Sequence, residues 1–163
     1  MVAAAVLAGG AVLGIVPAAP AAAEPDPVPV TFTVSTSQAH PGDTVTITAT
    51  FADPDGADVA FSYLSLNPHF VTWFDGPTYS FTSCTGDITW CELRGDDHTA
   101  LALHHAAPIP GGQTRTATFT YTIATDSSCG PLEEASFFFY SYRETAAGGT
   151  DAVVPGPSTI VVC

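Results

Sequence analysis

Three aspartates in one short turn carry the oxygen atoms that a calcium ion prefers. Asp53, Asp55 and Asp58 surround Gly56, and calcium takes several oxygen ligands from a short, flexible segment. The order differs from that of an EF-hand, because the glycine follows the second aspartate and no glutamate stands near the twelfth position. The segment therefore predicts either a calcium loop or an ordinary acidic turn.

A second set of metal-ligand types follows further along the chain. Asp96, His98 and His104 offer one carboxylate and two imidazoles, a combination that suits zinc or copper. If residues 100–105 form a strand, His104 and His105 point to opposite faces, so at most one of them joins His98. The alternative is that these histidines are solvated.

Aromatic side chains concentrate in a span of twenty-one residues. They are Phe70, Trp73, Phe74, Tyr79, Phe81 and Trp90. Rings exposed on a β-sandwich and rimmed by acids can stack on the faces of sugars, whereas buried rings fill the core. We expect the ligand contacts of this segment to come from Phe70, Trp73, Phe74, Tyr79 and Trp90.

The motifs of the common enzyme classes are missing from the sequence. It contains no Gly-x-Ser-x-Gly elbow, no His-Glu-x-x-His helix and no glycine-rich phosphate loop. Glu133 and Glu134 are paired carboxylates, but adjacent residues diverge in direction, and they follow a turn-forming Gly130-Pro131. We therefore predict a protein without catalytic activity.

The N-terminal residues predict export. An apolar run over residues 2–16 leads to the small triplet Ala21-Ala22-Ala23, which is typical of a secretory signal peptide cleaved after Ala23. The apolar run is short for a membrane span, so we expect no stable membrane anchor and a secreted, extracellular product. An acidic, proline-rich spacer over 24–29 then precedes a single domain over 30–163.

The four cysteines predict two structural disulfides, because their number is even and the predicted compartment is oxidising. Three pairings are formally open. Cys84 and Cys91 flank the turn-like Thr85-Gly86-Asp87, so their bridge needs the least rearrangement and leaves Cys129 with Cys163. In the loop-entropy account, closing 8 and 35 residues contributes roughly 2.5 and 3.8 kcal/mol.

The side chains named above must be positioned by strands. Apolar residues alternate with threonine or serine, which is the period of a half-buried strand, and no stretch shows a helical period. The expected strands cover 30–35, 44–51, 59–66, 70–74, 78–84, 88–93, 100–105, 116–123, 135–144 and 158–163. Proline and glycine turns separate them, among them Gly148-Gly149. This pattern predicts an all-β, antiparallel β-sandwich of about seven to ten strands.

The charge balance excludes several partners and chemistries. Sixteen acidic residues stand against three arginines and no lysine, which gives a net charge of −13. Such an excess repels phosphate backbones, so we expect no nucleic-acid partner. Without lysine the chain has no Schiff-base chemistry and no lysine-based isopeptide crosslink.

The order of several short motifs resembles a known family. They are Pro41-Gly42-Asp43-Thr44-Val45-Thr46-Ile47-Thr48, the pair Cys84 and Cys91-Glu92-Leu93, Ile109-Pro110-Gly111-Gly112-Gln113, and Thr118-Phe119-Thr120-Tyr121-Thr122. Over about residues 30–125 this order is similar to domain of unknown function 11, a conserved repeat domain of secreted and surface proteins of bacteria. Two departures are Asp53-Pro54-Asp55-Gly56, where the family has Asn-x-Gly, and an insertion at 95–108.

The resemblance implies an immunoglobulin-like β-sandwich with a structural or interaction role. We therefore expect a secreted, non-catalytic module without a cofactor that contacts an extracellular protein or a cell-envelope component. One alternative is a carbohydrate-binding module that holds a glycan on exposed aromatics. A further alternative is an extracellular protein that binds calcium, zinc or copper.

Overall fold

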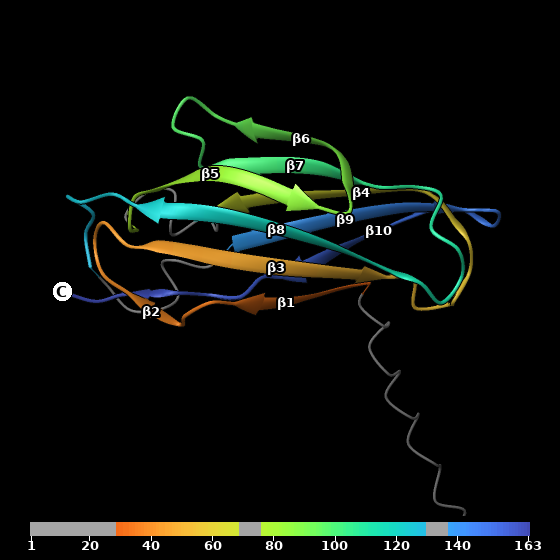
Figure 1. Cartoon of the computed structure of the whole chain (residues 1–163), viewed down its shortest axis with the longest axis horizontal. Coiled ribbons are helices and arrows are strands. Elements are labelled where there is room, and N and C mark those ends of the chain that lie inside the picture. The colour runs from red at the N-terminus through yellow and green to blue at the C-terminus, as the bar shows by residue number, and fades with distance from the viewer. Residues whose placement is uncertain (1–28, 69–75, 130–136) are drawn as a thin grey trace, which may run out of the picture.

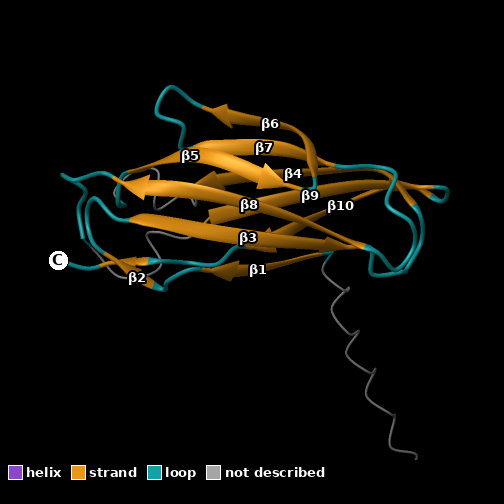
Figure 2. Ribbon diagram, in the orientation of Figure 1, coloured by secondary structure: helices purple, strands orange, loops and turns teal. Residues whose placement is uncertain are grey.

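The computed structural model describes residues 29–68, 76–129 and 137–163. Within these residues the chain consists of strands and loops only (Figure 2). The strands are β1 (Val30–Val34), β2 (Gln38–Ala39), β3 (Thr44–Ala52), β4 (Val59–Pro68), β5 (Tyr79–Gly86), β6 (Ile88–Arg94), β7 (Ala100–His105), β8 (Thr114–Ile123), β9 (Phe137–Thr145), β10 (Gly148–Pro155) and β11 (Ile160–Val161). A search of the described residues for a helix long and apolar enough to cross a membrane finds none.

The longer strands form two antiparallel sheets that pack face to face (Figure 1). The four-stranded sheet has the order β1-β3-β8-β5, and the five-stranded sheet has the order β10-β9-β4-β7-β6. The short strands β2 and β11 form a small parallel pair near the C-terminus. The predicted all-β, antiparallel sandwich with two disulfides is confirmed.

The alternation of threonine with apolar residues sets the two faces of the four-stranded sheet. In β3 the side chains of Val45, Ile47, Ala49 and Phe51 are fully buried, while the threonines between them point outward. β8 repeats this pattern, and the register places threonine opposite threonine across the two strands. The outer face of this sheet is therefore a layer of hydroxyl groups without charge.

The five-stranded sheet supplies the other half of the core. Leu64 and Leu66 of β4, Leu101 and Leu103 of β7, and Phe139 of β9 are all fully buried. They pack against the phenylalanines of the four-stranded sheet; the rings of Phe119 and Phe139, for example, lie 6.5 Å apart. Burial of one such side chain stabilises the fold by about 1.5–3 kcal/mol.

The two disulfides join the predicted pairs of cysteines. Cys84 of β5 bonds to Cys91 of β6 with their Cα atoms 6.6 Å apart, and this bond links one sheet to the other at the point where the chain crosses. Cys129, which follows β8, bonds to the C-terminal Cys163 with their Cα atoms 5.8 Å apart. The second bond fixes the segment that carries β11.

Two parts of the strand prediction differ from the structure. Gly148-Gly149 was expected to be a turn, but these glycines begin β10, and Gly148 pairs with Thr145 at the end of β9. Gly148 adopts a positive φ of 120°, a region that favours glycine. The glycine is therefore needed at the point where the chain returns from β9 into β10. The predicted terminal strand over 158–163 is shortened to β11, and the predicted strand over 70–74 lies outside the described residues.

A histidine lies in the core between the sheets. The side chain of His105 is 2% exposed, and its Nδ1 lies 2.9 Å from the Oγ of the fully buried Ser62. Burial lowers the pKa of His105 from 6.5 to about 4, an effect that the Arg115 charge adds to and the Asp87 charge opposes. The folded protein therefore holds this imidazole neutral at pH 7.

This histidine predicts a loss of stability on acidification. Between pH 6.5 and about 4 the unfolded chain protonates His105 while the folded chain does not, so unfolding takes up a proton and the free energy of unfolding falls as the pH falls. The full loss is about 3 kcal/mol. We expect His105→Gln to flatten this part of the pH profile in urea denaturation, and an unchanged slope would contradict the assignment.

Candidate functional site

The acidic turn after β3 is held by an arginine and not arranged as a cage of oxygen ligands. Arg143 of β9 places its Nε 2.6 Å from Asp53 Oδ1 and its Nη2 3.2 Å from Asp55 Oδ2. Asp58 turns away and accepts a hydrogen bond from the backbone N–H of Gly111 at 2.7 Å. Of the predicted ligands, Asp53 and Asp55 thus share Arg143, whereas Asp58 binds a backbone amide.

The histidines of the predicted transition-metal site are also separated. His98 lies with Asp96 in the turn between β6 and β7, where its φ is 53°. His104 lies on β7, on the face opposite to His105, as its position in the strand predicts. Over the described ranges, no three His, Cys, Asp or Glu side chains come together as metal ligands.

The predicted aromatic segment divides into three parts. Phe70, Trp73 and Phe74 lie outside the described residues. Tyr79, named as a possible ligand contact, is 7% exposed, and its ring packs edge-on against Phe81 in the core, which is the alternative for these rings. Trp90 is 37% exposed on β6. Of the described members, only Trp90 offers an exposed ring.

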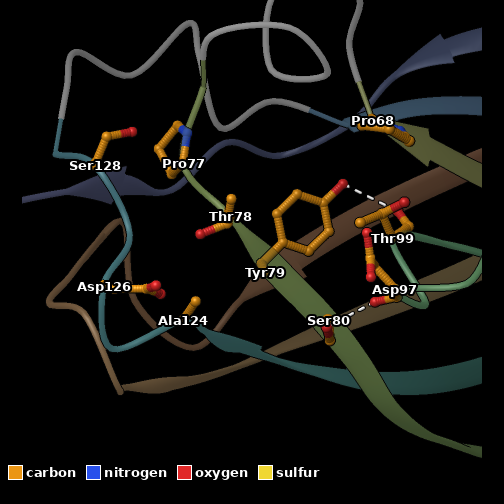
Figure 3. A pocket seen from close by; sticks show the side chains of 10 residues that line it. All are labelled: Pro68, Pro77, Thr78, Tyr79, Ser80, Asp97, Thr99, Ala124, Asp126 and Ser128. Atoms are coloured by element: carbon orange, nitrogen blue, oxygen red, sulfur yellow. Dashed lines mark hydrogen bonds between the residues drawn. The ribbon is translucent and has the colours of Figure 1, made fainter.

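A cavity of about 680 Å³ lies at the end of the sandwich where β5 begins (Figure 3). The Tyr79 hydroxyl donates a hydrogen bond to the Thr99 carbonyl at 3.1 Å, and Ser80 Oγ donates to the Asp97 carbonyl at 2.7 Å. Burial raises the pKa of Tyr79 above its ordinary value, so the hydroxyl stays protonated. These wall groups bond to the backbone, and the described residues that line the cavity include no histidine or cysteine.

A larger aromatic surface covers the outside of the five-stranded sheet. The register places Trp90 of β6 beside His104 of β7, His104 beside Tyr63 of β4, and Tyr63 beside Tyr142 of β9. These four side chains form a row across four neighbouring strands. Neighbouring strands in a sheet lie about 4.7–4.9 Å apart. Phe61 and Tyr140 extend the row along β4 and β9. We call these six residues the aromatic face.

The rings of the aromatic face pack against each other at steep angles. The centroids of Trp90 and His104 lie 4.6 Å apart with planes at 41°, and those of Phe61 and His104 lie 4.9 Å apart at 69°. Tyr63 and Tyr140 meet at 64° over 6.2 Å. Tilted and edge-to-face contacts of this kind hold rings in place, so the aromatic face is contoured and preorganised and lacks a flat, coplanar platform.

An arginine of the same sheet lies on the aromatic face. The Arg94 guanidinium is 5.9 Å from the centre of the Trp90 ring. Its Nη1 donates to the Tyr63 hydroxyl at 3.1 Å, and its Nε donates to Glu92 Oε2 at 2.9 Å. The hydrogen bond to Glu92 raises the pKa of Arg94, so the cation is permanent. The aromatic face thus already binds one guanidinium of its own chain.

Carboxylates border the aromatic face on both sides. Glu92 lies on β6 at one edge, and the exposed Glu144 and Asp151 lie on β9 and β10 at the other. Asp151 stands opposite Tyr142 in the register. The Tyr142 hydroxyl donates to Glu144 Oε1 at 2.9 Å, and this hydrogen bond raises the pKa of Tyr142. The rim is therefore acidic.

The arginines do not offset this acidity at the surface, because all three lie in the described part of the chain and are bound there. Arg143 pairs with Asp53 and Asp55, and Arg94 pairs with Glu92. Arg115 donates its Nε to the Ala106 carbonyl at 2.9 Å. The chain thus offers no uncommitted guanidinium to an anionic ligand.

A glycine allows Tyr142 to lie close to β10. A Cβ built on Gly149 would collide with the Tyr142 hydroxyl and ring edge. Any larger residue at position 149 must therefore push this ring away from β10. We expect Gly149→Ala to disturb the aromatic face while leaving the two disulfides in place.

Sequence reasoning placed the contact surface in a contiguous segment and missed most of the aromatic face. The available signal was the alternate placement of Phe61 with Tyr63 and of Tyr140 with Tyr142, because residues two apart share one face of a strand. That these two pairs lie on adjacent strands follows only from the pairing of β4 with β9.

Comparison of the sequence with protein-family models and with curated proteins finds no match. Solved structures do match. The sixth cohesin of scaffoldin B from Acetivibrio cellulolyticus, solved in complex with a dockerin, has a TM-score of 0.51 and 9% identity, and the match covers 83% of this chain and 100% of the cohesin.

Two further solved structures, a pilin subunit and an adhesin domain, share the fold. The major pilin subunit BcpA of Bacillus cereus matches with a TM-score of 0.57 and 5% identity over 82% of this chain. The N-terminal domain of a Streptococcus gordonii adhesin matches with a TM-score of 0.53 and 11% identity over 84%. This chain spans 40% of the pilin structure and 33% of the adhesin structure. At these identities the similarity is one of fold: the chain shares the β-sandwich of cohesin, pilin and adhesin modules.

Proposed function

We propose that this chain is an exported, non-catalytic interaction module that binds a protein partner through its aromatic face. The observation that carries the proposal is the set of side chains on the outer face of the five-stranded sheet. Tryptophan, tyrosine and arginine are the residue types that dominate binding energy at protein interfaces. Here Trp90, Tyr63, Tyr142 and Arg94 lie together on one preorganised surface.

The ring geometry favours a protein over a polysaccharide. A sugar chain stacks best on rings that lie roughly parallel to one another, whereas neighbouring rings of the aromatic face meet at 41° to 69°. A contoured surface of this kind suits a partner whose side chains enter between the rings. The carbohydrate-binding alternative therefore depends on the single exposed ring of Trp90.

A close serine–histidine pair lies in the core, closed to any substrate. Ser62 and His105 have the types and the 2.9 Å separation of a nucleophile and its base, an arrangement used in covalent catalysis. Their residues are 0% and 2% exposed, between the two sheets. A substrate has no access to them, so the pair belongs to the core.

The fold and the disulfides support an extracellular setting. Two disulfides are expected of a domain that folds in an oxidising compartment. The solved structures with this fold include a cohesin bound to a dockerin, a major pilin and an adhesin. The resemblance to domain of unknown function 11 points the same way, to a module that contacts other molecules at the cell surface.

The proposal is tested by alanine substitution on the two faces of the sandwich. We expect Trp90→Ala and Tyr63→Ala each to weaken partner binding by at least about 30-fold, the effect of losing a hot-spot residue. The matched control is Thr48→Ala with Thr118→Ala, which changes the hydroxyl layer of the other sheet. Binding to the envelope and secreted proteins of the source is measured with immobilised wild type and variants.

Two results would contradict the proposal. One is that the variants of the aromatic face and those of the hydroxyl face weaken partner binding by the same factor. The other is binding of purified envelope polysaccharides with a change in tryptophan emission that Trp90→Ala abolishes, which would establish the carbohydrate-binding alternative. Thermal melts of each variant show that the fold is kept.

A further inference from the structure

We propose that the partner meets the aromatic face with a basic segment, whose arginine or lysine side chains lie on the rings and pair with the acidic rim. This inference rests on the proposed function and names the chemistry of the partner. It follows from the contacts that the chain makes with its own Arg94.

Arg94 shows how the aromatic face recognises a cation. Its guanidinium lies over the Trp90 ring, hydrogen-bonds the Tyr63 hydroxyl and pairs with Glu92. One arginine thus uses a ring, a phenol and a carboxylate at the same time. Aromatic rings attract cations placed over their faces, and the attraction grows as water is excluded.

The other side of the aromatic face offers the same kinds of group, a tyrosine and two carboxylates, without an arginine of the chain. Tyr142 provides a ring, its hydroxyl is bonded to Glu144, and Asp151 stands opposite it on β10. Of the two other arginines, Arg143 pairs with Asp53 and Asp55, and Arg115 is bonded to backbone carbonyls elsewhere. Among the described residues, no arginine of the chain pairs with Glu144 or Asp151, so these carboxylates beside the Tyr142 ring can take a cation from a partner.

The net charge of the chain selects the same class of partner. At −13 the protein attracts basic segments over a distance set by the salt concentration. A second copy of the chain carries the same charge and is repelled. The residues that precede the domain contain no lysine or arginine, so the chain's own N-terminal segment does not have the chemistry either.

The test uses a short peptide that alternates arginine with glycine, and the same peptide with citrulline in place of arginine. We expect the mature chain to bind the first peptide and to lose at least about tenfold in affinity for the second. Tyr142→Ala leaves the charge of the protein unchanged and should weaken binding by a similar factor. Glu144→Gln with Asp151→Asn should weaken it more than Asp97→Asn with Asp126→Asn, a matched pair at the end cavity.

The outcomes separate this inference from the proposed function. The inference is overturned if both pairs of acid variants lower the affinity for the arginine peptide equally, or if Tyr142→Ala leaves that affinity unchanged. Either result shows attraction by net charge only. No binding of the arginine peptide also overturns it. If Trp90→Ala abolishes binding of a natural partner but Glu144→Gln with Asp151→Asn leaves it unchanged, the proposed function stands. The inference that the partner contributes a basic segment is then wrong.

Discussion

Replacing Arg143 with alanine should lower the free energy of unfolding by about 3–5 kcal/mol, the usual loss when one partner of a buried ion pair is removed. The side chains of Arg143 and Asp53 are 12% and 3% exposed, and they join β9 to the turn after β3. Without the arginine the Asp53 carboxylate stays buried without its cation. Urea denaturation of wild type and variant measures the change.

Two further variants define the cause. Arg94→Ala removes an exposed arginine paired with Glu92 and should change stability by less than about 1 kcal/mol. The double variant Asp53→Asn with Arg143→Met removes both charges and should recover part of the loss. A loss below about 1 kcal/mol in Arg143→Ala would mean that water reaches Asp53 and that the ion pair is not structural.

Removing the Cys129–Cys163 bond by a double alanine substitution should cost about 3.8 kcal/mol, because the unfolded chain gains the freedom of a 35-residue loop. The bond fixes the C-terminal segment, whose backbone pairs β11 with β2 through Ile160 N–H to the Ser37 carbonyl at 2.8 Å and Val162 N–H to the Ala39 carbonyl at 2.9 Å. Chemical denaturation with intact Cys84–Cys91 measures the loss.

The shorter disulfide provides the comparison. The corresponding double substitution of Cys84 and Cys91 opens a loop of 8 residues and should cost about 2.5 kcal/mol. Without the Cys129–Cys163 bond, hydrogen exchange should be fastest to increase at the amides of Ile160 and Val162. An equal loss in the two variants, or protection of those amides in both, would contradict this assignment.

Most of the fold follows from local sequence pattern. Threonine alternates with apolar residues through β3 and β8 and identifies both strands and their buried faces, because the side-chain period of a strand is two. β10 could not be recognised in the same way. It begins with Gly148-Gly149, residues that usually mark a turn, and it forms a strand here because β9 offers an edge for pairing.

The candidate site was less predictable, because it is built by pairing between strands distant in sequence. Trp90 is the exposed ring of the predicted aromatic segment, but its neighbours Tyr63 and Tyr142 come from β4 and β9. Tyr79 lies in the same segment as Trp90 and yet points into the core, because it is on the inner face of β5 together with Phe81. Proximity in sequence was therefore a poor guide to a shared surface.

The acidic turn illustrates the same difficulty for charged residues. Asp53, Asp55 and Asp58 have the spacing of oxygen ligands, but Arg143 lies ninety residues from Asp53 along the chain. Only the fold brings its guanidinium to the turn. Asp53 and Asp55 resemble metal ligands in the sequence, but in the structure they are the partners of Arg143.

Photo-crosslinking from two positions tests the central claim most directly. A photoreactive amino acid is placed at Trp90 on the aromatic face, or at Thr118 on the hydroxyl layer of the other sheet, and the chain is irradiated with the envelope and secreted proteins of its source. We expect one protein to be crosslinked from position 90 and not from position 118. Crosslinks to that protein from position 118 alone, or none from position 90 while the chain binds a polysaccharide, would contradict a protein-binding role for the aromatic face.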